Sequence, residues 1–453
     1  MNITQRVFAL CLFLVAIFLL FYKLGVNSFV NWDEAYFATV ARDMATRNDF
    51  VVGFFNGNPW FYEPPYLTWV LALVFKFSQS EFWLRAANAF SSLVLLLAVY
   101  ATSWKLYKSY WAGFITVIIL LSNIEFLFRS RQINVEVPLT LFFVASLYFL
   151  IKFKDAKKPY LVVLAAFCLA LSFLTKRASP FLIIPSIGFL FFSIKPLRNF
   201  RAIILFLITL AAFVLPWVSL SFAKWGNVFI REFVINFTVG KILSSNPATG
   251  SSILFYVYSL VHSFKIWSLL IPFALVWACF KIPKNKLLGA YLIYFLAFFI
   301  FLTIAPIKAS WYLVPAYPAL AILVAGFVLW VSSRFVKIHL LLFVLVVGIF
   351  FAQLIRWNSS YFVPDVTREQ ADFSKIVGMQ VPNDYVYLDD DYLPVAAYYS
   401  RKLILPLRFD RSADFAAETL VLNQSEYVMT NILNREALEK RSGLKFSVVY
   451  QNH

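Results

Sequence analysis

Apolar runs long enough to cross a lipid bilayer recur along most of this chain, and no other feature limits its possible folds so strongly. A helix needs about 20 apolar residues to span the hydrocarbon core, and such runs include residues 7–24, 137–151, 203–222 and 340–355. Hydrophobic residues make up 61% of the chain and charged residues 14%, which is unlike a soluble domain. We therefore expect a polytopic α-helical membrane protein.

The loops between these runs differ in charge, which predicts the topology. We place spans at residues 6–24, 85–104, 110–128, 137–151, 160–174, 179–194, 202–222, 262–280, 288–304, 312–331 and 338–356. Short basic loops, such as those holding Lys154 and Lys284, are expected in the cytoplasm by the positive-inside rule. The first outer loop, residues 25–84, and everything after 357 then lie outside. The apolar segment 66–77 is too short to span and is expected to be interfacial or re-entrant. Since such half-spans could add to the 11 spans, the expected total is about 11–13 helices.

Several other classes of protein and site are disfavoured. The first apolar run lacks a small-residue cleavage pattern, so it is expected to be a retained span rather than a signal peptide. The net charge of +17 does not indicate a nucleic-acid partner, because no basic helix or stacking motif stands apart from the membrane segments. The three cysteines and three histidines show no zinc spacing. No cofactor is expected from them, although a divalent cation bound by carboxylates remains open.

The composition changes after residue 357, where polar residues and proline return. Short β-prone runs at 385–388, 402–407, 419–422 and 446–450 alternate with helix-like stretches such as 434–441. We therefore expect a small α/β extracytoplasmic domain at 358–453, after a transmembrane domain at 1–357. This domain lacks a Gly-rich phosphate loop.

The first outer loop carries an adjacent acid pair, Asp33 and Glu34, directly after a complete span. Carboxylates near lipid are costly unless they have a partner or a function. The alternative is structural, because Asp33 could cap a helix over residues 34–45.

Further motifs follow this pair in the outer loops. They are Arg42-Asp43-Met44, Asn56-Gly57, Tyr62-Glu63-Pro64-Pro65, Arg131-Gln-Ile-Asn-Val-Glu136, Leu174-Thr-Lys176 and Lys308-Ala-Ser-Trp-Tyr312. Together they resemble the GT-C superfamily of glycosyltransferases, specifically the protein-O-mannosyltransferase and lipid A aminoarabinose transferase relatives, over about residues 1–330. The resemblance implies a GT-C fold for the membrane domain.

The resemblance also implies an activity: transfer of a sugar from a polyprenyl-phosphate donor to a glycan, lipid or protein hydroxyl on the extracytoplasmic face, with inversion. It further implies a bacterial or archaeal cytoplasmic membrane as the location. A transporter or flippase of polyprenyl-linked glycans, and an oligosaccharyltransferase or glycan ligase, remain open as alternatives.

Inverting transfer needs a carboxylate to take the proton of the acceptor hydroxyl while phosphate departs from the opposite face. We expect Asp33 to be this base and Glu136 to be the second acid, which orients the acceptor or holds a cation. The departing phosphate needs cations to stabilise its charge. The alternative for each outer-loop cation is that it only anchors the protein at the lipid surface. The outer-loop cations are Arg131, Lys176, Arg177, Arg231, Lys241 and Lys308.

The full expected substrate-binding set is Glu34, Arg42, Glu63, Arg131, Lys176, Arg231, Lys241, Lys308 and Tyr312. A structural role stays open for Glu34. Three positions depart from the family pattern: Tyr36 stands for a frequent Arg, Pro64 for a Lys, and Glu136 for an Asp. Because the lysine missing at position 64 is an expected phosphate or acceptor contact, neither lipid A nor aminoarabinose is assigned.

Overall fold

The computed structural model describes residues 3–240, 252–334, 347–348, 350–352, 365–389, 393–407, 416, 420, 427–430, 432–449 and 451. The chain forms two compact units. Residues 1–24, 61–70 and 85–362 make the first, and residues 25–60, 71–84 and 363–453 make the second. Most of the first outer loop therefore packs with the C-terminal segment. The domain boundary expected at 357 lies outside the described residues.

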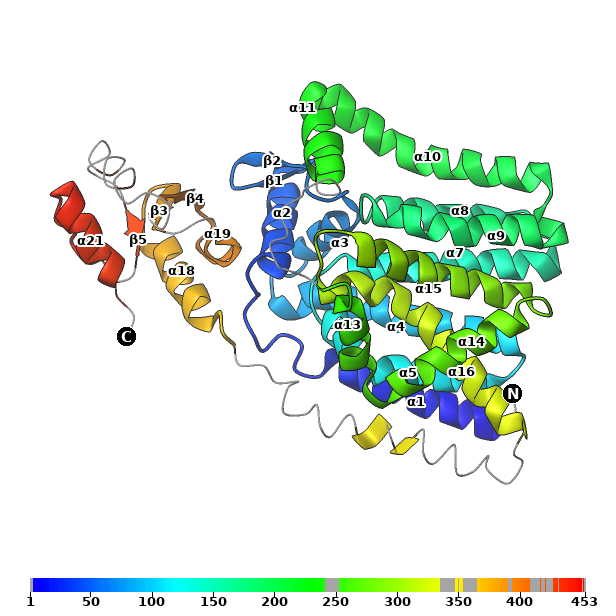
Figure 1. The fold of residues 1–453 in the computed structure, drawn as a ribbon. Helices are drawn as coiled ribbons and strands as arrows, with labels where there is room; N and C mark the ends of the chain where they lie inside the picture. Colours follow the sequence, from blue (N-terminus) through cyan, green and yellow to red (C-terminus); the bar gives the residue numbers. More distant parts are fainter. Residues whose placement is uncertain are drawn as a thin grey trace. The chain divides into compact units, whose positions relative to one another are not determined.

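The first unit is helical (Figure 1). In its described part, seven helices are long and apolar enough to cross a membrane, or eight if a pair bent by 80° counts as one span. The bent pair is α5 (Tyr110–Leu121) and α6 (Ile124–Ser130). The long spans are α1 (Ile3–Phe21), α4 (Glu81–Tyr107), α7 (Glu136–Ala156), α10 (Phe200–Trp225), α13–η4–α14 (Phe255–Lys281), α15 (Lys286–Ile304) and η5–α16 (Ser310–Arg334).

These helices confirm a multi-pass membrane fold. Two expected spans are shorter apolar helices: α8 (Tyr160–Phe173), and η1 with α9 (Ser179–Ser193). The segment expected to be interfacial is α3 (Tyr66–Phe75). The span expected at 338–356 lies mostly outside the described residues, so the count of 11–13 stays a prediction. Short elements η2 (Lys195–Leu197), α11 (Asn227–Phe229) and η3 (Ile230–Gly240) complete the unit.

Close helix packing in the first unit depends on small residues. Helix α16 runs beside α5, and its residues 317–326 are all buried. A Cβ atom at Gly326 would overlap the Tyr107 hydroxyl, which donates a hydrogen bond to the Ile322 carbonyl at 3.0 Å. Small residues allow membrane helices to approach this closely, so Gly326 lets the Tyr107 ring pack against α16.

The second unit combines a helix, a hairpin and a small sheet. Helix α2 (Asp33–Arg47) is followed by the antiparallel hairpin β1 (Gly53–Phe55) and β2 (Asn58–Trp60). The hairpin turn residues Asn56 and Gly57 have φ of 51° and 81°, as a two-residue turn with left-handed conformations requires. The C-terminal segment forms a three-stranded sheet in the order β4-β3-β5, in which both strand pairs are parallel.

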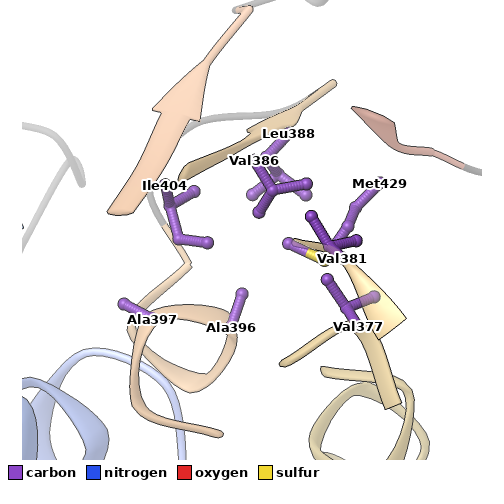
Figure 2. Packing of buried hydrophobic residues seen from close by; sticks show 8 residues of the cluster. All are labelled: Val377, Val381, Val386, Leu388, Ala396, Ala397, Ile404 and Met429. Atoms are coloured by element: carbon purple, nitrogen blue, oxygen red, sulfur yellow. The ribbon is translucent and has the colours of Figure 1, made fainter. Parts of the chain in front are cut away.

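This sheet packs on helices around a small apolar core. Its strands are β3 (Tyr385–Leu388), β4 (Leu403–Pro406) and β5 (Val428–Met429), and the helices of the segment are α18 (Arg368–Gln380), α19 (Pro394–Ser400) and α21 (Ile432–Ser442). Figure 2 shows Val386 and Ile404 of the sheet directed toward Ala396 and Val377 of the helices. Burial of these side chains stabilises the segment by the hydrophobic effect.

The elements expected in the tail have mixed outcomes. The strands expected at 385–388 and 402–407 and the helix at 434–441 are confirmed as β3, β4 and α21. The run 419–422 lies outside the described residues except for Leu420. The strand expected at 446–450 is wrong for 446–449, because the backbone N–H and C=O of Phe446 bond to the Glu439 and Arg435 side chains of α21 instead of a neighbouring strand.

Candidate active site

Two consecutive cations of the first unit, Lys176 and Arg177, each form an ion pair with a glutamate that lies far away in the sequence. The Lys176 Nζ atom lies 2.8 Å from Oε1 of Glu136, and the Arg177 Nε atom lies 3.5 Å from Oε2 of Glu63. The side chains are 16% and 6% exposed in the first pair, and 7% and 6% in the second. We refer to these four residues as the charged cluster.

Glu136 owes its position to two buried amides. It is the first residue of α7, and the Asn134 side chain accepts a hydrogen bond from the Val137 N–H at 3.2 Å. The Asn88 side chain of α4 donates to the carbonyls of Gln132 and Asn134 at 2.7 and 2.9 Å. Both asparagines are 1% exposed. Together they fix the turn that precedes Glu136.

Glu63 is positioned by the junction between α3 and α8. Two prolines follow Glu63, and the N–H of Tyr66 then donates to the carbonyl of Leu174 at 2.9 Å. This bond joins the start of α3 to the residues just before Arg177. The Arg177 N–H in turn donates to Oε2 of Glu63 at 3.4 Å.

Two tyrosine rings complete the cluster. The Lys176 ammonium lies 4.9 Å from the ring centre of Tyr312, and the Arg177 guanidinium lies 4.9 Å from that of Tyr62. Both distances fall within the range of a cation–π interaction. Burial, and then the Glu63 carboxylate, raise the pKa of Tyr62 above its usual range, so its hydroxyl stays protonated and can donate a hydrogen bond.

The charge of Lys176 is stabilised by its surroundings. Burial alone would lower its pKa, but the carboxylates of Glu136 and Glu63 outweigh burial and raise the pKa above its usual range. An ammonium group carries three N–H donors, and Glu136 accepts one of them in this structure. Lys176 therefore stays protonated at neutral pH, and its ammonium carries the charge and donors that an anionic ligand would need.

Other expected cations of the first unit bind helix ends. Arg131 donates to the carbonyls of Leu19, Leu20 and Tyr22 at the end of α1. Lys308 donates to those of Thr303 and Ala305 at the end of α15. Cations favour this position because the last carbonyls of a helix are unpaired and partially negative. A phosphate contact of either residue stays a prediction.

The remaining expected site residues lie apart from these contacts. Arg231 pairs with its neighbour Glu232 at 3.1 Å, and its side chain is 66% exposed. Lys241 lies outside the described residues. Across the described ranges, there is no group of three or more His, Cys, Asp or Glu residues that could hold a metal ion. The divalent cation left open for Glu136 stays a prediction.

Asp33, Glu34 and Arg42 belong to the second unit. Asp33 is the first residue of α2, and Trp32 occupies the capping position with φ of 71°. The helix thus begins one residue earlier than the range expected from the sequence. Glu34 is 1% exposed and accepts the Val30 N–H at 3.2 Å, which supports the structural role left open for it. Arg42 pairs with Asp43 at 3.0 Å.

Sequence reasoning assigned Glu63, Glu136, Lys176 and Tyr312 to the site, and the structure brings these four together. It named Arg177 among the outer-loop cations but left it out of the substrate-binding set, and it did not assign Asn88 or Asn134. A signal existed for Arg177, which directly follows the matched Lys176, and for Asn134, which lies inside the motif ending at Glu136. Asn88 gave no signal, since a single asparagine in an apolar span has no distinctive pattern.

Comparison with known proteins identifies relatives of this chain. The family described as dolichyl-phosphate-mannose-protein mannosyltransferase matches residues 62–219, a range that contains the whole charged cluster. An uncharacterized protein of Aquifex aeolicus (strain VF5) is 28% identical over 324 residues, which cover 70% of this chain and 63% of that protein.

A relative with a named activity is also similar to this chain. The undecaprenyl phosphate-alpha-4-amino-4-deoxy-L-arabinose arabinosyl transferase 1 of Proteus mirabilis (strain HI4320) is 25% identical over 350 residues, which cover 74% of this chain and 62% of that protein. The chain thus spans less than two thirds of the length of these two relatives.

The crystal structure of ArnT from Cupriavidus metallidurans bound to undecaprenyl phosphate superposes with a TM-score of 0.74 and 17% identity, covering 93% of this chain and 89% of that one. This likeness extends over nearly the whole chain and shows the fold. The chain is therefore similar to the protein mannosyltransferases over part of its length and to an arabinosyl transferase over most of it, and it has the membrane fold of the ArnT structure.

Proposed function

We propose that this protein transfers a sugar from a polyprenyl-phosphate donor to a hydroxyl of a glycan, lipid or protein acceptor, with inversion at the sugar carbon. The observation that carries the proposal is the charged cluster, in which Lys176 and Arg177 follow one another at the end of an apolar helix and are held by buried glutamates. A lipid-linked phosphate is the anion expected to reach cations at such a place.

The cluster suits a phosphate leaving group in particular. Negative charge develops on the phosphate oxygens as the bond to the sugar breaks, and a positioned ammonium stabilises that charge in a water-poor site. The two glutamates hold the cations in place before the donor arrives, so little reorganisation is needed. The Proteus mirabilis relative is named for an undecaprenyl-phosphate donor, and the ArnT structure holds undecaprenyl phosphate.

The proposed chemistry balances as a single displacement. The acceptor oxygen forms a bond to the sugar carbon, its proton passes to a carboxylate, and the bond from that carbon to the phosphate oxygen breaks. The polyprenyl phosphate leaves with the bonding electron pair and is stabilised by Lys176. We assign the base role to Asp33 and an orienting role to Glu136, in line with the resemblance.

The proposed location follows from the basic loops. Lys154 and Lys284 lie in loops that the positive-inside rule assigns to the cytoplasm. Asp33 and the charged cluster then face the opposite side of a bacterial or archaeal cytoplasmic membrane. The donor and acceptor would meet there.

A direct test uses the purified protein in lipid nanodiscs with radiolabelled undecaprenyl-phosphate mannose and undecaprenyl-phosphate aminoarabinose as probes. Transfer of label to an added membrane acceptor fraction, with release of undecaprenyl phosphate, supports the proposal. If label instead moves across sealed vesicles with its phosphate bond intact, the protein is a transporter and the proposal is wrong.

The carboxylates are then compared at matched expression and folding. Asp33→Asn is expected to reduce turnover by about 100- to 10,000-fold, the usual contribution of a general base. Normal turnover in Asp33→Asn with loss in Glu136→Gln would move the base to Glu136. Normal turnover in both would refute the proposed chemistry.

A further inference from the structure

Within the second unit, the first outer loop is fastened to the C-terminal segment by side chains on both sides of Asp33. The nearest is Asn31, two residues before it. The Asn31 Oδ1 atom accepts the Val395 N–H at the start of α19 at 3.0 Å, and its Nδ2 atom donates to Gln370 of α18 at 2.9 Å. One amide therefore joins the start of α2 to two helices of the C-terminal segment.

Arg42 makes the second attachment, which lies within α2 and nine residues after Asp33. Its Nη1 atom donates to the carbonyls of Ala397 and Tyr398 of α19, both at 3.0 Å. Asp43 holds the same guanidinium from the side. The Arg42 side chain is 12% exposed, so these bonds are largely shielded from water. Asp33 and Arg42 are thus about 13 Å apart along the helix axis, and α19 bonds the residue that precedes α2 and the body of α2 at separate points.

Asn56 makes a third attachment, from the hairpin turn to the edge of the sheet. Its Nδ2 atom donates to the Ile404 carbonyl and its Oδ1 atom accepts the Ile404 N–H, both at 2.6 Å. The side-chain amide thus replaces a neighbouring strand at the outer edge of β4. An unpaired strand edge is otherwise open to other chains.

The stretch just before α2 is anchored as well. The Phe29 ring is fully buried and lies 5.1 Å from that of Tyr398. The Phe29 N–H donates to the Tyr399 hydroxyl, and the Phe29 carbonyl accepts a hydrogen bond from Thr367. Both backbone polar groups of Phe29, which lies shortly before Asp33, are therefore bonded to the C-terminal segment.

From these contacts we propose that the C-terminal segment clamps α2, and that Asn31 and Arg42 are positioning residues that act through Asp33. The clamp rests on the proposed function for its link to turnover. It gives Arg42 a role different from the substrate contact expected from the sequence. It also gives the tail, which the motif resemblance does not cover, a part in the reaction.

The physical reason is the marginal stability of a short helix. An isolated helix of 15 residues is barely stable in water, and α2 has that length. Catalytic groups must be held within about 0.5 Å of their productive position, and a shift of about 1 Å can reduce turnover 100-fold. Loosening the clamp should therefore lower kcat while the affinity for the donor changes little.

The main variant is Asn31→Ala in the full-length protein, assayed with the undecaprenyl-phosphate sugar probes. We expect kcat to fall by at least about 10-fold, with KM for the donor within about twofold of the wild type. Asn31→Asp keeps the oxygen that accepts the Val395 N–H and should restore most of kcat. The matched control is Asn434→Ala, which removes an amide bonded to Asp389 within the C-terminal segment and should leave both constants unchanged.

A double variant shows whether Asn31 acts through Asp33. Effects of residues that act through one another are not additive, so adding Asn31→Ala to Asp33→Asn should cause no further loss. Multiplied losses in the double variant, or normal kcat in Asn31→Ala, would overturn the clamp. Normal turnover in Asp33→Asn would remove the proposed base and overturn the clamp with it.

Hydrogen exchange tests the clamp without any turnover. It therefore tests the proposal even if the two sugar probes are not substrates of this protein. Asn31→Ala and Arg42→Ala should speed exchange of the α2 backbone amides by about 10-fold or more, because local opening becomes easier. Asn434→Ala should not. Unchanged α2 exchange in both clamp variants would overturn the proposal.

Discussion

Replacing Lys176 by Met probes the charged cluster most directly. The change keeps the length of the side chain but removes the ammonium that lies 2.8 Å from Glu136. Glu136 is only 4% exposed, so its carboxylate would remain buried without its main partner. Removal of one partner from a buried pair costs about 3–5 kcal/mol. Because the Lys176 side chain keeps 16% exposure, we expect about 3 kcal/mol of lost unfolding free energy.

The double variant Lys176→Met with Glu136→Gln measures the interaction between the two residues apart from the effect of each single change. Both charges are then absent, so no buried charge is left unpaired, and most of the lost stability should return. The expected coupling free energy is about 2 kcal/mol, within the range for residues in direct contact. Denaturant unfolding in detergent micelles, followed by tryptophan fluorescence, measures it.

The Lys105–Asp155 pair supplies a matched control in the same unit. Its atoms lie 2.6 Å apart, but the two side chains are 28% and 60% exposed. Exposed pairs contribute about 0–1 kcal/mol, so Lys105→Met should have little effect on stability. If Lys176→Met is no more destabilising than Lys105→Met, or if the two cluster changes add independently, the reasoning about the buried pair is refuted.

Donor binding should behave differently from stability. A hydrogen bond to a charged group contributes about 1.5–3 kcal/mol, so Lys176→Met should raise KM for the lipid donor by about 10-fold or more. The double variant should not recover this loss, although it recovers stability. Equal KM in wild type and Lys176→Met would remove this lysine from the donor site.

The pH dependence of the pair has a definite sign. The pKa of Lys176 is raised in the folded protein. The stability that Lys176 contributes is therefore complete below its unfolded pKa of about 10.4 and is lost only as pH rises through its folded pKa. Lys176 should therefore cause no change in stability between about pH 6 and about pH 9. A lysine-dependent loss in that window, absent from Lys176→Met, would contradict the stabilised charge.

Three further predictions concern other parts of the chain. Asn88→Ala should free the turn before Glu136 and lower kcat by about 10-fold; unchanged kcat would contradict its positioning role. The pKa of Asp365 is lowered because, against the effect of burial, it accepts a backbone N–H of the first outer loop. The stability that Asp365 contributes is complete above its unfolded pKa of about 3.9 and is lost as pH falls through its folded pKa. In Asp365→Asn, hydrogen exchange of the second unit should therefore no longer speed up with the protonation of this carboxylate. Finally, cysteines introduced at Asp33 and at Lys284 should label from opposite sides of sealed vesicles; labelling from one side would refute the topology.

The sequence alone determined the class of protein and many of its parts. Hydropathy predicts membrane spans because a lipid-exposed helix must be apolar along its whole length, and seven such helices are present in the described part of the chain. Short runs of β-prone residues predicted β3 and β4, and a helix-like stretch predicted α21. The motifs pointed to Glu63, Glu136, Lys176 and Tyr312 because they are local patterns of residue type.

Tertiary structure decided which residue meets which. Lys176 reaches Glu136 across 40 positions and Arg177 reaches Glu63 across 114, and those encounters depend on helix packing and on hydrogen bonds between distant segments. Residues 446–449 resemble a strand, but side chains of α21 bind the backbone of Phe446 instead. Most of the first outer loop shares one compact unit with the C-terminal segment, although the membrane spans separate them in sequence. Local pattern records the preference of a segment, whereas partners distant in the chain depend on the packing of all the elements between them.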